Sequence, residues 1–417
     1  MTFPDFFRAF TRIGLLSFGG PAAQIALMHR ELVDERKWLS EAEFLRALSF
    51  CMMLPGPEAM QLATYAGWKL RGVVGGIIAG LLFVLPGAAV IAALALLYLS
   101  FGDQSLVRAA FVGVKAAVIA IVLEALLRIS KRALKGRLHY ALAAAAFVAL
   151  AVFHLPFPLV ILVAGLIGAV TAPQAEAPSL PAPPSTRALR VATIAGALWV
   201  APLLAAKAAG ATFLTEIGIF FSKIAVVTFG GAYAVLAYMA QEVVTGRGWL
   251  TPLQMVDALG LAETTPGPLI LVSQFVAMLA CASQGGIPLT LLAGAMTLWV
   301  TFVPCFLWIF AGAPYIDWLA GRPRLSAALS GITAAVVGVI LNLSLWFALH
   351  VGFRSVGEAS LGPARLPLPD PASADGLAIL LAVLASYLLL KRQWGLGKVL
   401  GLSAVLGLAL GGWGGLG

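Results

Sequence analysis

The chain has 417 residues, of which 61% are hydrophobic and only 11% charged, and its formal net charge at pH 7 is +9. A soluble domain carries about 25% charged residues and about 45–50% apolar ones, so this composition leaves too little polar surface for a water-soluble globule. It excludes a cytosolic enzyme, a secreted disulfide-rich protein and a disordered chain, and it predicts an all-α, polytopic membrane protein.

The positive charge comes from 27 Lys and Arg residues against 18 Asp and Glu residues, and it lies in short clusters between apolar runs. Such clusters are typical of cytoplasmic loops of membrane proteins, so we expect no nucleic-acid partner. The three cysteines have no CxxC spacing and the four histidines form no cluster, so we expect no disulfide framework, metal or cofactor. The first residues lack a basic region followed by a cleavage site, so we expect the first span to be retained.

Apolar stretches of roughly 20 residues predict the membrane-spanning segments in chain order, about 13 in all. Before residue 172 they cover 8–28, 44–70 (interrupted), 73–100, 106–127, 138–153 and 157–171. After residue 187 they cover 188–208, 214–240, 253–280 (interrupted), 286–312, 325–349, 376–390 and 396–413. The short segments within 138–171 and 376–413 fit either tilted spans or partial hairpins.

A polar stretch, residues 172–187, separates two related halves of the chain. Its prolines prevent a packed helix, so it is typical of a linker. Residues 10–57 align without a gap on residues 221–268, with 18 identities in 48 positions. The sequence therefore predicts an N-terminal repeat over 1–171 and a C-terminal repeat over 188–417.

The loop charges predict that the two repeats have opposite orientations. Loop 128–137 holds five basic residues, which indicates the cytoplasmic side, whereas its counterpart 350–375 has two arginines against three acids. The short loop near Asp103 has no basic residue, whereas its counterpart carries Arg322 and Arg324. Inverted-topology repeats are a transporter architecture, with the substrate site near the membrane midplane.

Two motifs occur once in each half. The first is Ser/Thr-Phe-Gly-Gly at 17–20 and 228–231, and the second is Pro-Gly-Pro at 55–57 and 266–268. Proline removes a hydrogen-bond donor and glycine supplies unusual backbone conformations, so both motifs predict helix breaks at membrane depth. Broken backbone is tolerated there when it is buried in protein or lines a wet cavity. The alternative is a kink that serves only helix packing.

The half-helices that start at these breaks are candidate anion sites, because a helix N-terminus presents free N–H groups and a positive dipole end. The predicted substrate-binding residues at the breaks are Gly19, Gly20, Pro55, Gly56, Pro57, Gly230, Gly231, Pro266, Gly267 and Pro268.

Charged residues inside apolar segments are the next candidates. Arg12 and Lys223 occupy equivalent positions in the two halves, and Lys115 lies near the middle of 106–127. Each could attract the anion, although Arg12 and Lys223 could also extend to a membrane interface. Glu58 and Glu263 flank the Pro-Gly-Pro motifs and are candidates for proton coupling, because loss of water disfavours a charged carboxylate. The alternative for Glu58 is a helix-capping role.

The runs Ser17-Phe-Gly-Gly-Pro-Ala-Ala-Gln-Ile-Ala26, Arg36-Lys-Trp-Leu-Ser40 and Cys51-Met-Met-Leu-Pro-Gly-Pro-Glu-Ala-Met-Gln-Leu-Ala-Thr64 resemble the chromate ion transporter family in its two-domain form. The resemblance covers nearly the whole chain. It implies a bacterial inner-membrane protein that exports chromate from the cytoplasm, with sulfate as a competitor. It extends to the glycines and prolines of the two motifs and to Glu58.

We therefore expect a secondary transporter that moves a tetrahedral oxyanion outward by alternating access. A dianion that leaves a cell with a negative interior gains about 2.3 kcal/mol per charge for each 100 mV. The sequence predicts that the transporter lies in the lipid bilayer, either as a single chain or as a homodimer. The alternatives are a transporter of sulfate or another oxyanion, a passive anion channel, and a membrane enzyme, for which no catalytic cluster is visible in the sequence.

Overall fold

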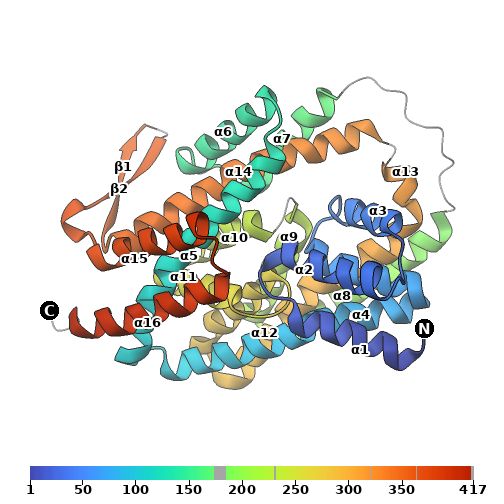
Figure 1. Cartoon of the computed structure of the whole chain (residues 1–417), viewed down its shortest axis with the longest axis horizontal. Coiled ribbons are helices and arrows are strands. Elements are labelled where there is room, and N and C mark those ends of the chain that lie inside the picture. Colours follow the sequence, from blue (N-terminus) through green and yellow to red (C-terminus); the bar gives the residue numbers. More distant parts are fainter. Residues whose placement is uncertain (173–184, 230–231, 321, 363, 415–417) are drawn as a thin grey trace. The chain divides into compact units, whose positions relative to one another are not determined.

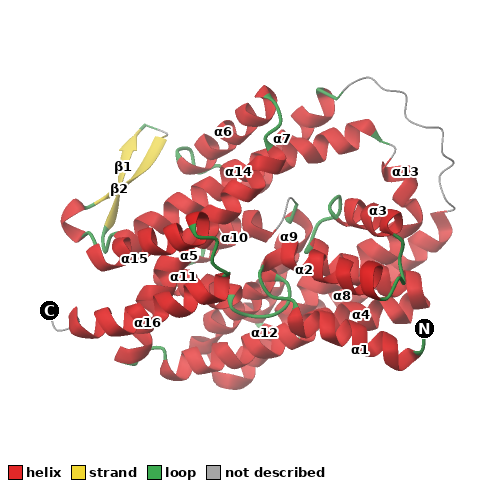
Figure 2. Ribbon diagram, viewed as in Figure 1, coloured by secondary structure: helices red, strands yellow, loops and turns green. Residues whose placement is uncertain are grey.

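A computed structural model describes residues 1–172, 185–229, 232–320, 322–362 and 364–414. These residues are overwhelmingly helical, and Figure 2 shows helices throughout with one small pair of strands. The helices of the first half are α1 (Phe3–Leu16), α2 (Gly20–His29), α3 (Glu41–Cys51), α4 (Glu58–Phe101), α5 (Ser105–Ala133), α6 (Arg137–Ala151) and α7 (Phe157–Val170) (Figure 1).

The second half repeats much of this order. Its helices are α8 (Ser185–Ala208), α9 (Thr212–Val227), α10 (Ala232–Gln241), α11 (Pro252–Glu263), α12 (Val272–Gly312), α13 (Ile316–Ala320), α14 (Pro323–Gly352), α15 (Gly376–Ser386) and α16 (Leu396–Gly414). Single turns of tighter or wider helix are η1 (Arg30–Glu35), η2 (Glu242–Gly246), η3 (Leu269–Leu271), η4 (Ala313–Tyr315), η5 (Pro371–Ser373) and η6 (Tyr387–Lys391).

Five helical stretches in the described part of the chain are long and apolar enough to cross a membrane. They are Glu58–Phe101, Ser105–Ala133, Ala188–Ala208, Leu269–Tyr315 and Pro323–Gly352. Shorter apolar helices cover 137–151, 157–170, 376–391 and 396–410. The chain is therefore an all-α, multi-pass membrane protein, as its composition predicts, and the total of about 13 spans stays a prediction.

Two of the long helices fold back on themselves. In α4 the backbone leaves helical geometry at Gly72 (φ 65°, ψ −160°), and in α12 it does so at Gly286 (φ 69°, ψ −166°). Gly67 and Gly75, on either side of the first bend, approach so closely that a Cβ on either would lie 2.4 Å from the carbonyl oxygen of the other. Each long element is thus a hairpin of a short helix and a longer one, which agrees with the segment boundaries predicted near residues 72 and 286.

The predicted loop 350–375 contains the strands β1 (Val356–Leu361) and β2 (Ala364–Pro369). They pair antiparallel, with Val356 opposite Pro369 and Leu361 opposite Ala364. The sequence analysis did not foresee this hairpin, because the prolines of the second strand cannot donate to a ladder and argue against a strand. In a two-stranded hairpin each strand has a neighbour on one side only, so a proline whose nitrogen lies on the open side costs no hydrogen bond between the strands.

The chain divides into two compact units. Unit 1 comprises residues 1–96, 173–235 and 265–326, and unit 2 comprises residues 97–172, 236–264 and 327–417. Each unit takes segments from both predicted repeats. The Pro-rich linker lies almost entirely on residues 173–184, outside the described residues. The division into repeats over 1–171 and 188–417 stays a prediction about sequence relationship.

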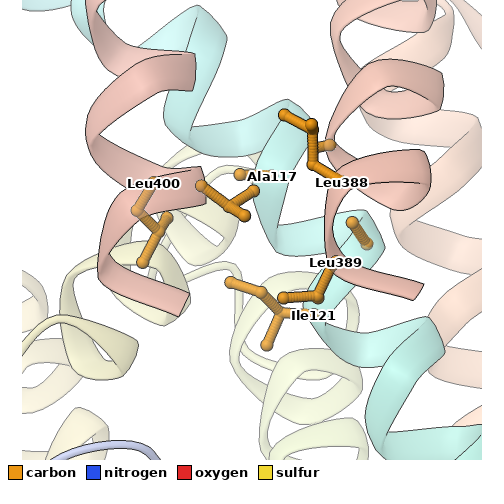
Figure 3. Packing of buried hydrophobic residues seen from close by; sticks show 8 residues of the cluster. Ala117, Ile121, Leu388, Leu389 and Leu400 are labelled. Carbon is orange, nitrogen blue, oxygen red and sulfur yellow. The ribbon is translucent and has the colours of Figure 1, made fainter. Parts of the chain in front are cut away.

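In unit 1 the hairpin helix α12 packs against α8 and α9. In unit 2 the central helix α5 packs against α11, α15 and α16. Figure 3 shows the apolar contact between α5, η6 and α16, where alanines on α5 leave room for leucines of the other two elements. The buried residues of this cluster are Ala117, Ala120, Ile121, Ala385, Leu388, Leu389, Val399 and Leu400.

Candidate functional site

The two Pro-Gly-Pro motifs are helix breaks, as predicted. Helix α3 ends at Cys51 and α4 begins at Glu58, directly after Pro57. In the second half α11 ends at Glu263, and helix resumes at Leu269 after Pro268. The central glycines have positive φ angles, 117° at Gly56 and 89° at Gly267, a region that residues with a Cβ avoid. Each motif therefore joins two short helices through a turn that requires glycine.

The first Phe-Gly-Gly motif is also a break. Helix α1 ends at Leu16 and α2 begins at Gly20, with φ angles of 84° at Gly19 and 77° at Gly20. In the second half α9 ends at Val227 and α10 begins at Ala232. The site candidates Gly230 and Gly231 lie between them, outside the described residues.

Each Pro-Gly-Pro turn is hydrogen-bonded to the Phe-Gly-Gly segment of the other half. The Gly56 N–H donates to the Thr228 carbonyl at 2.9 Å, and the Gly267 N–H donates to the Ser17 carbonyl at 2.9 Å. In the sequence alignment Ser17 matches Thr228 and Gly56 matches Gly267. The two hydrogen bonds therefore join equivalent positions, each from one half to the other. All four residues belong to unit 1. The motifs that sequence analysis singled out separately thus meet in one place.

Two buried glutamines hold these turns, and sequence analysis missed both. Gln24 Nε2 donates to the Gly267 carbonyl at 2.7 Å and to the Ser17 carbonyl at 3.3 Å. Gln61 Nε2 donates to the Pro55 carbonyl at 2.7 Å. The signal that could have found them is an amide side chain within an apolar segment and a few residues from a motif, because such a group needs a partner when buried.

The glutamines also leave acceptor capacity at the turns. The Oε1 atoms of Gln24 and Gln61 are buried and have no hydrogen-bond partner among the described residues.

Because Gly56 and Gly267 already use their own N–H groups, an anion at either turn must take N–H groups from the first turn of the following helix. That turn begins at the half-buried Glu58 in α4.

The predicted cation Arg12 lies in an ion pair. Its Nη1 atom is 2.9 Å from Oε1 of Glu31, and Arg36 Nε approaches the other oxygen of the same carboxylate at 3.4 Å. The Glu31 side chain is completely buried, so two guanidinium groups compensate its charge. The equivalent cation Lys223 is exposed on α9. Sequence spacing alone did not predict that Arg12 and Arg36 both pair with Glu31.

The segment after each Phe-Gly-Gly motif has the same local structure in both halves. The Arg36 guanidinium lies 5.1 Å from the centre of the Trp38 ring, and the Arg247 guanidinium lies 4.9 Å from that of Trp249. The backbone N–H of Trp38 donates to the Leu32 carbonyl at 2.8 Å, and the backbone N–H of Trp249 donates to the matching carbonyl of Val243 at 2.8 Å. Each tryptophan follows a wide helical turn, η1 or η2. The conserved local geometry agrees with two related halves.

Lys115 belongs to unit 2, and it pairs with Asp257 in a network that also includes Tyr98 and that sequence analysis missed. Its Nζ atom lies 3.3 Å from Oδ1 of Asp257 on α11, and the Tyr98 hydroxyl donates to Oδ2 of the same carboxylate at 2.8 Å. The Lys115 side chain is 16% exposed and that of Asp257 is 6% exposed. No sequence signal links residues 115 and 257, because the contact depends on how α5 packs against α11.

Glu263, the second proton-coupling candidate, is buried at the end of α11 and also belongs to unit 2. Glu58 belongs to unit 1. Among the described residues no three His, Cys, Asp or Glu side chains gather where they could hold a metal ion.

Short helices broken at matched turns, within a chain that has several helices long enough to span a bilayer, define a class of protein: a multi-pass α-helical membrane protein with discontinuous helices, as found in secondary transporters. The family model for chromate transporters matches residues 4–169 and 215–413. The chain belongs to the chromate transporter family, which confirms the resemblance found in the sequence.

Three relatives are similar over most of their length. The chromate transport protein of Pseudomonas aeruginosa is 36% identical over 345 residues, which is 82% of this chain and 80% of the relative. The chromate transport protein of Cupriavidus metallidurans is 32% identical over 336 residues, 79% of each chain. The probable chromate transport protein of Synechococcus elongatus is 31% identical over 333 residues, 79% of this chain and 81% of the relative. No solved structure matches this chain.

Proposed function

We propose that this protein exports chromate from the cytoplasm across the inner membrane of a bacterium, as a secondary transporter that works by alternating access. The observation that carries the proposal is the family match over two stretches that together span most of the chain, with relatives named as chromate transport proteins. The paired Pro-Gly-Pro turns in unit 1 give the proposal a candidate site.

The proposed site holds the oxyanion at the two half-helix starts. N–H groups in the first turns after Pro57 and Pro268 donate to its oxygens, and the positive ends of the helix dipoles favour its negative charge. The motif residues Gly19, Gly20, Pro55, Gly56, Pro57, Gly230, Gly231, Pro266, Gly267 and Pro268 shape the backbone for this contact. Arg12 and Lys223 attract the anion toward it.

Two inverted repeats supply the alternating access. The reciprocal hydrogen bonds of Gly56 and Gly267 support this part of the proposal, because each half contributes the same contact to the other. In such architectures one group of helices rocks against another around a fixed midplane site. The opposite charge bias of loops 128–137 and 350–375 supports the opposite orientation of the halves.

The membrane potential favours the outward direction. A dianion gains about 2.3 kcal/mol per charge for each 100 mV when it leaves a negative interior, so the membrane potential favours export even without a coupled ion. Where protons are coupled, Glu58 and Glu263 are the carboxylates that carry them, because each is a buried or half-buried acid beside a helix break.

Uptake of labelled chromate into everted membrane vesicles tests the proposal. We expect saturable uptake that exceeds that of vesicles without the protein and that falls in the presence of excess sulfate, because both ions are tetrahedral dianions. A proton gradient added or collapsed in the same vesicles tests the coupling. Absence of uptake, or faster transport of sulfate than of chromate, contradicts the substrate assignment.

A further inference from the structure

The Lys115–Asp257 pair is a buried pair of opposite charges between two closely packed helices. A Cβ on Gly260, three residues after Asp257, would lie 2.5 Å from Val114 Cγ1, so the backbone of α11 runs close against α5 at this level. Ionisable side chains inside membrane helices are costly and are usually functional. Neither the Pro-Gly-Pro turns nor the family match gives this pair a role.

The two oxygens of Asp257 are held differently. Oδ2 accepts a hydrogen bond of 2.8 Å from the Tyr98 hydroxyl. Oδ1 is buried and lies 3.3 Å from Lys115 Nζ, and within the described part of the chain it accepts no well-aligned hydrogen bond. Tyr98 therefore fixes the carboxylate, and the ammonium group of Lys115 is the looser partner. A looser partner can exchange Asp257 for another anion without displacing the Asp257 side chain.

Lys115 lines two cavities of unit 2. One has a volume of about 450 Å³ and includes Tyr98 and Asp257 in its lining. The other has a volume of about 810 Å³ and includes the basic residues His350 and Arg354. A water occupies about 30 Å³ in the liquid, so either cavity has room for a hydrated oxyanion beside the ammonium group.

We propose that Lys115 is an oxyanion-binding site in unit 2 and that Asp257 is a built-in carboxylate that competes with the anion for it, so that a proton on Asp257 opens the site. The inference rests on the proposed function and deepens it by naming a second station for the oxyanion. It also assigns the pH dependence of anion binding at this second station to Asp257, separately from the coupling roles proposed for Glu58 and Glu263.

The charges determine the direction of the effect. While Asp257 is ionised, the pair has no net charge, and an incoming dianion must compete with the Asp257 carboxylate for the ammonium group of Lys115. When Asp257 takes up a proton, Lys115 keeps its positive charge without a competitor, and the Tyr98 hydroxyl remains a partner for the neutral acid. Proton binding and anion binding therefore favour each other, and by linkage the anion must bind more tightly as the pH falls.

Other charged groups line the same two cavities. Asp103 and Arg108 line the smaller cavity and pair with each other at 2.7 Å. His350, Arg354 and Asp375 line the larger one, where the Asp375 carboxylate accepts the N–H of Ala378.

Equilibrium binding of sulfate to the purified full chain, at acidic and at alkaline pH, tests this inference. Sulfate serves as the probe because it remains a dianion over the whole range. We expect wild-type affinity to fall as the pH rises. Asp257→Asn should bind sulfate about fivefold or more tightly at alkaline pH and lose the pH dependence, and Lys115→Met should lose this component of binding at both pH values. Asp103→Asn, in the same cavity, is the matched control and should keep the wild-type pattern.

Equal wild-type affinity at both pH values overturns the inference, and this measurement needs no variant that could fail to fold. An unchanged pH dependence in Asp257→Asn overturns it as well. Chromate uptake by vesicles is scored separately. If uptake fails while sulfate binding follows the expected pattern, the export proposal is wrong and the Lys115 site stands. If uptake succeeds but sulfate binding does not depend on pH, the export proposal stands and the Lys115 inference is wrong.

Discussion

At the scale of single residues, Gly56 is the most constrained position of the candidate site. Its φ angle is 117°, and an added Cβ would lie 2.9 Å from Cys305 Sγ and 2.8 Å from Gln61 Nε2. We expect Gly56→Ala to lower the free energy of unfolding in detergent by about 1–3 kcal/mol, because the backbone must adopt a conformation that residues with a Cβ avoid. Gly196→Ala is the control, since a Cβ there meets no atom within 4 Å. Equal stability of both variants contradicts the described turn.

His29, outside the membrane-spanning segments, gives a prediction about pH. Its Nε2 atom lies 2.6 Å from Oε2 of Glu41, and this hydrogen bond raises the pKa of His29 above 6.5, with Asp34 adding to the effect. A raised pKa in the folded state means that the pair stabilises the fold below pH 6.5 and that this stability is lost as the pH rises through the folded pKa.

The expected loss is small, about 0.5 kcal/mol, because the Glu41 side chain is 58% exposed and water screens the pair. Unfolding of the wild type and of Glu41→Gln, measured at several pH values across this range, checks it. The difference between the two proteins should shrink as the pH rises. A difference that is constant or that grows contradicts the assignment.

At the scale of elements, the prolines that precede each restarted helix set where that helix begins. Pro57→Ala restores a backbone N–H and frees the turn, so we expect the free energy of unfolding to fall by about 0.4–1 kcal/mol while chromate uptake falls much further than that loss explains. Pro202→Ala is the matched control because Pro202 lies inside helix α8, where proline has no favourable role. Retained uptake in Pro57→Ala contradicts the role of this half-helix start.

The helix breaks could be predicted from sequence because proline and glycine act locally on their own backbone. The capping box at Ser40 and Glu43 is another local feature, and it is present at the start of α3. Side-chain partners from distant segments could not be predicted. Asp257 lies opposite Lys115, and Gln24 reaches Gly267, only because helices far apart in the chain pack together. The hairpin of β1 and β2 was not predicted because the prolines in β2 argue against a strand.

At the scale of the whole molecule, the two halves share compact units rather than forming one unit each. Unit 1 holds residues 1–96, 173–235 and 265–326, and unit 2 holds residues 97–172, 236–264 and 327–417. Sequence alignment predicts two repeats, but it could not show how the segments sort into units. Each unit therefore contains segments from both halves of the chain.

The central claim is that the chain moves chromate as a carrier. Purified protein in liposomes, with a membrane potential imposed by a potassium gradient and valinomycin, tests it directly. We expect labelled chromate to accumulate on the positive side, with a rate that saturates and that unlabelled chromate on the opposite side accelerates, because a carrier returns faster when loaded. Flux that never saturates and shows no such acceleration, or no flux above that of empty liposomes, would contradict the account.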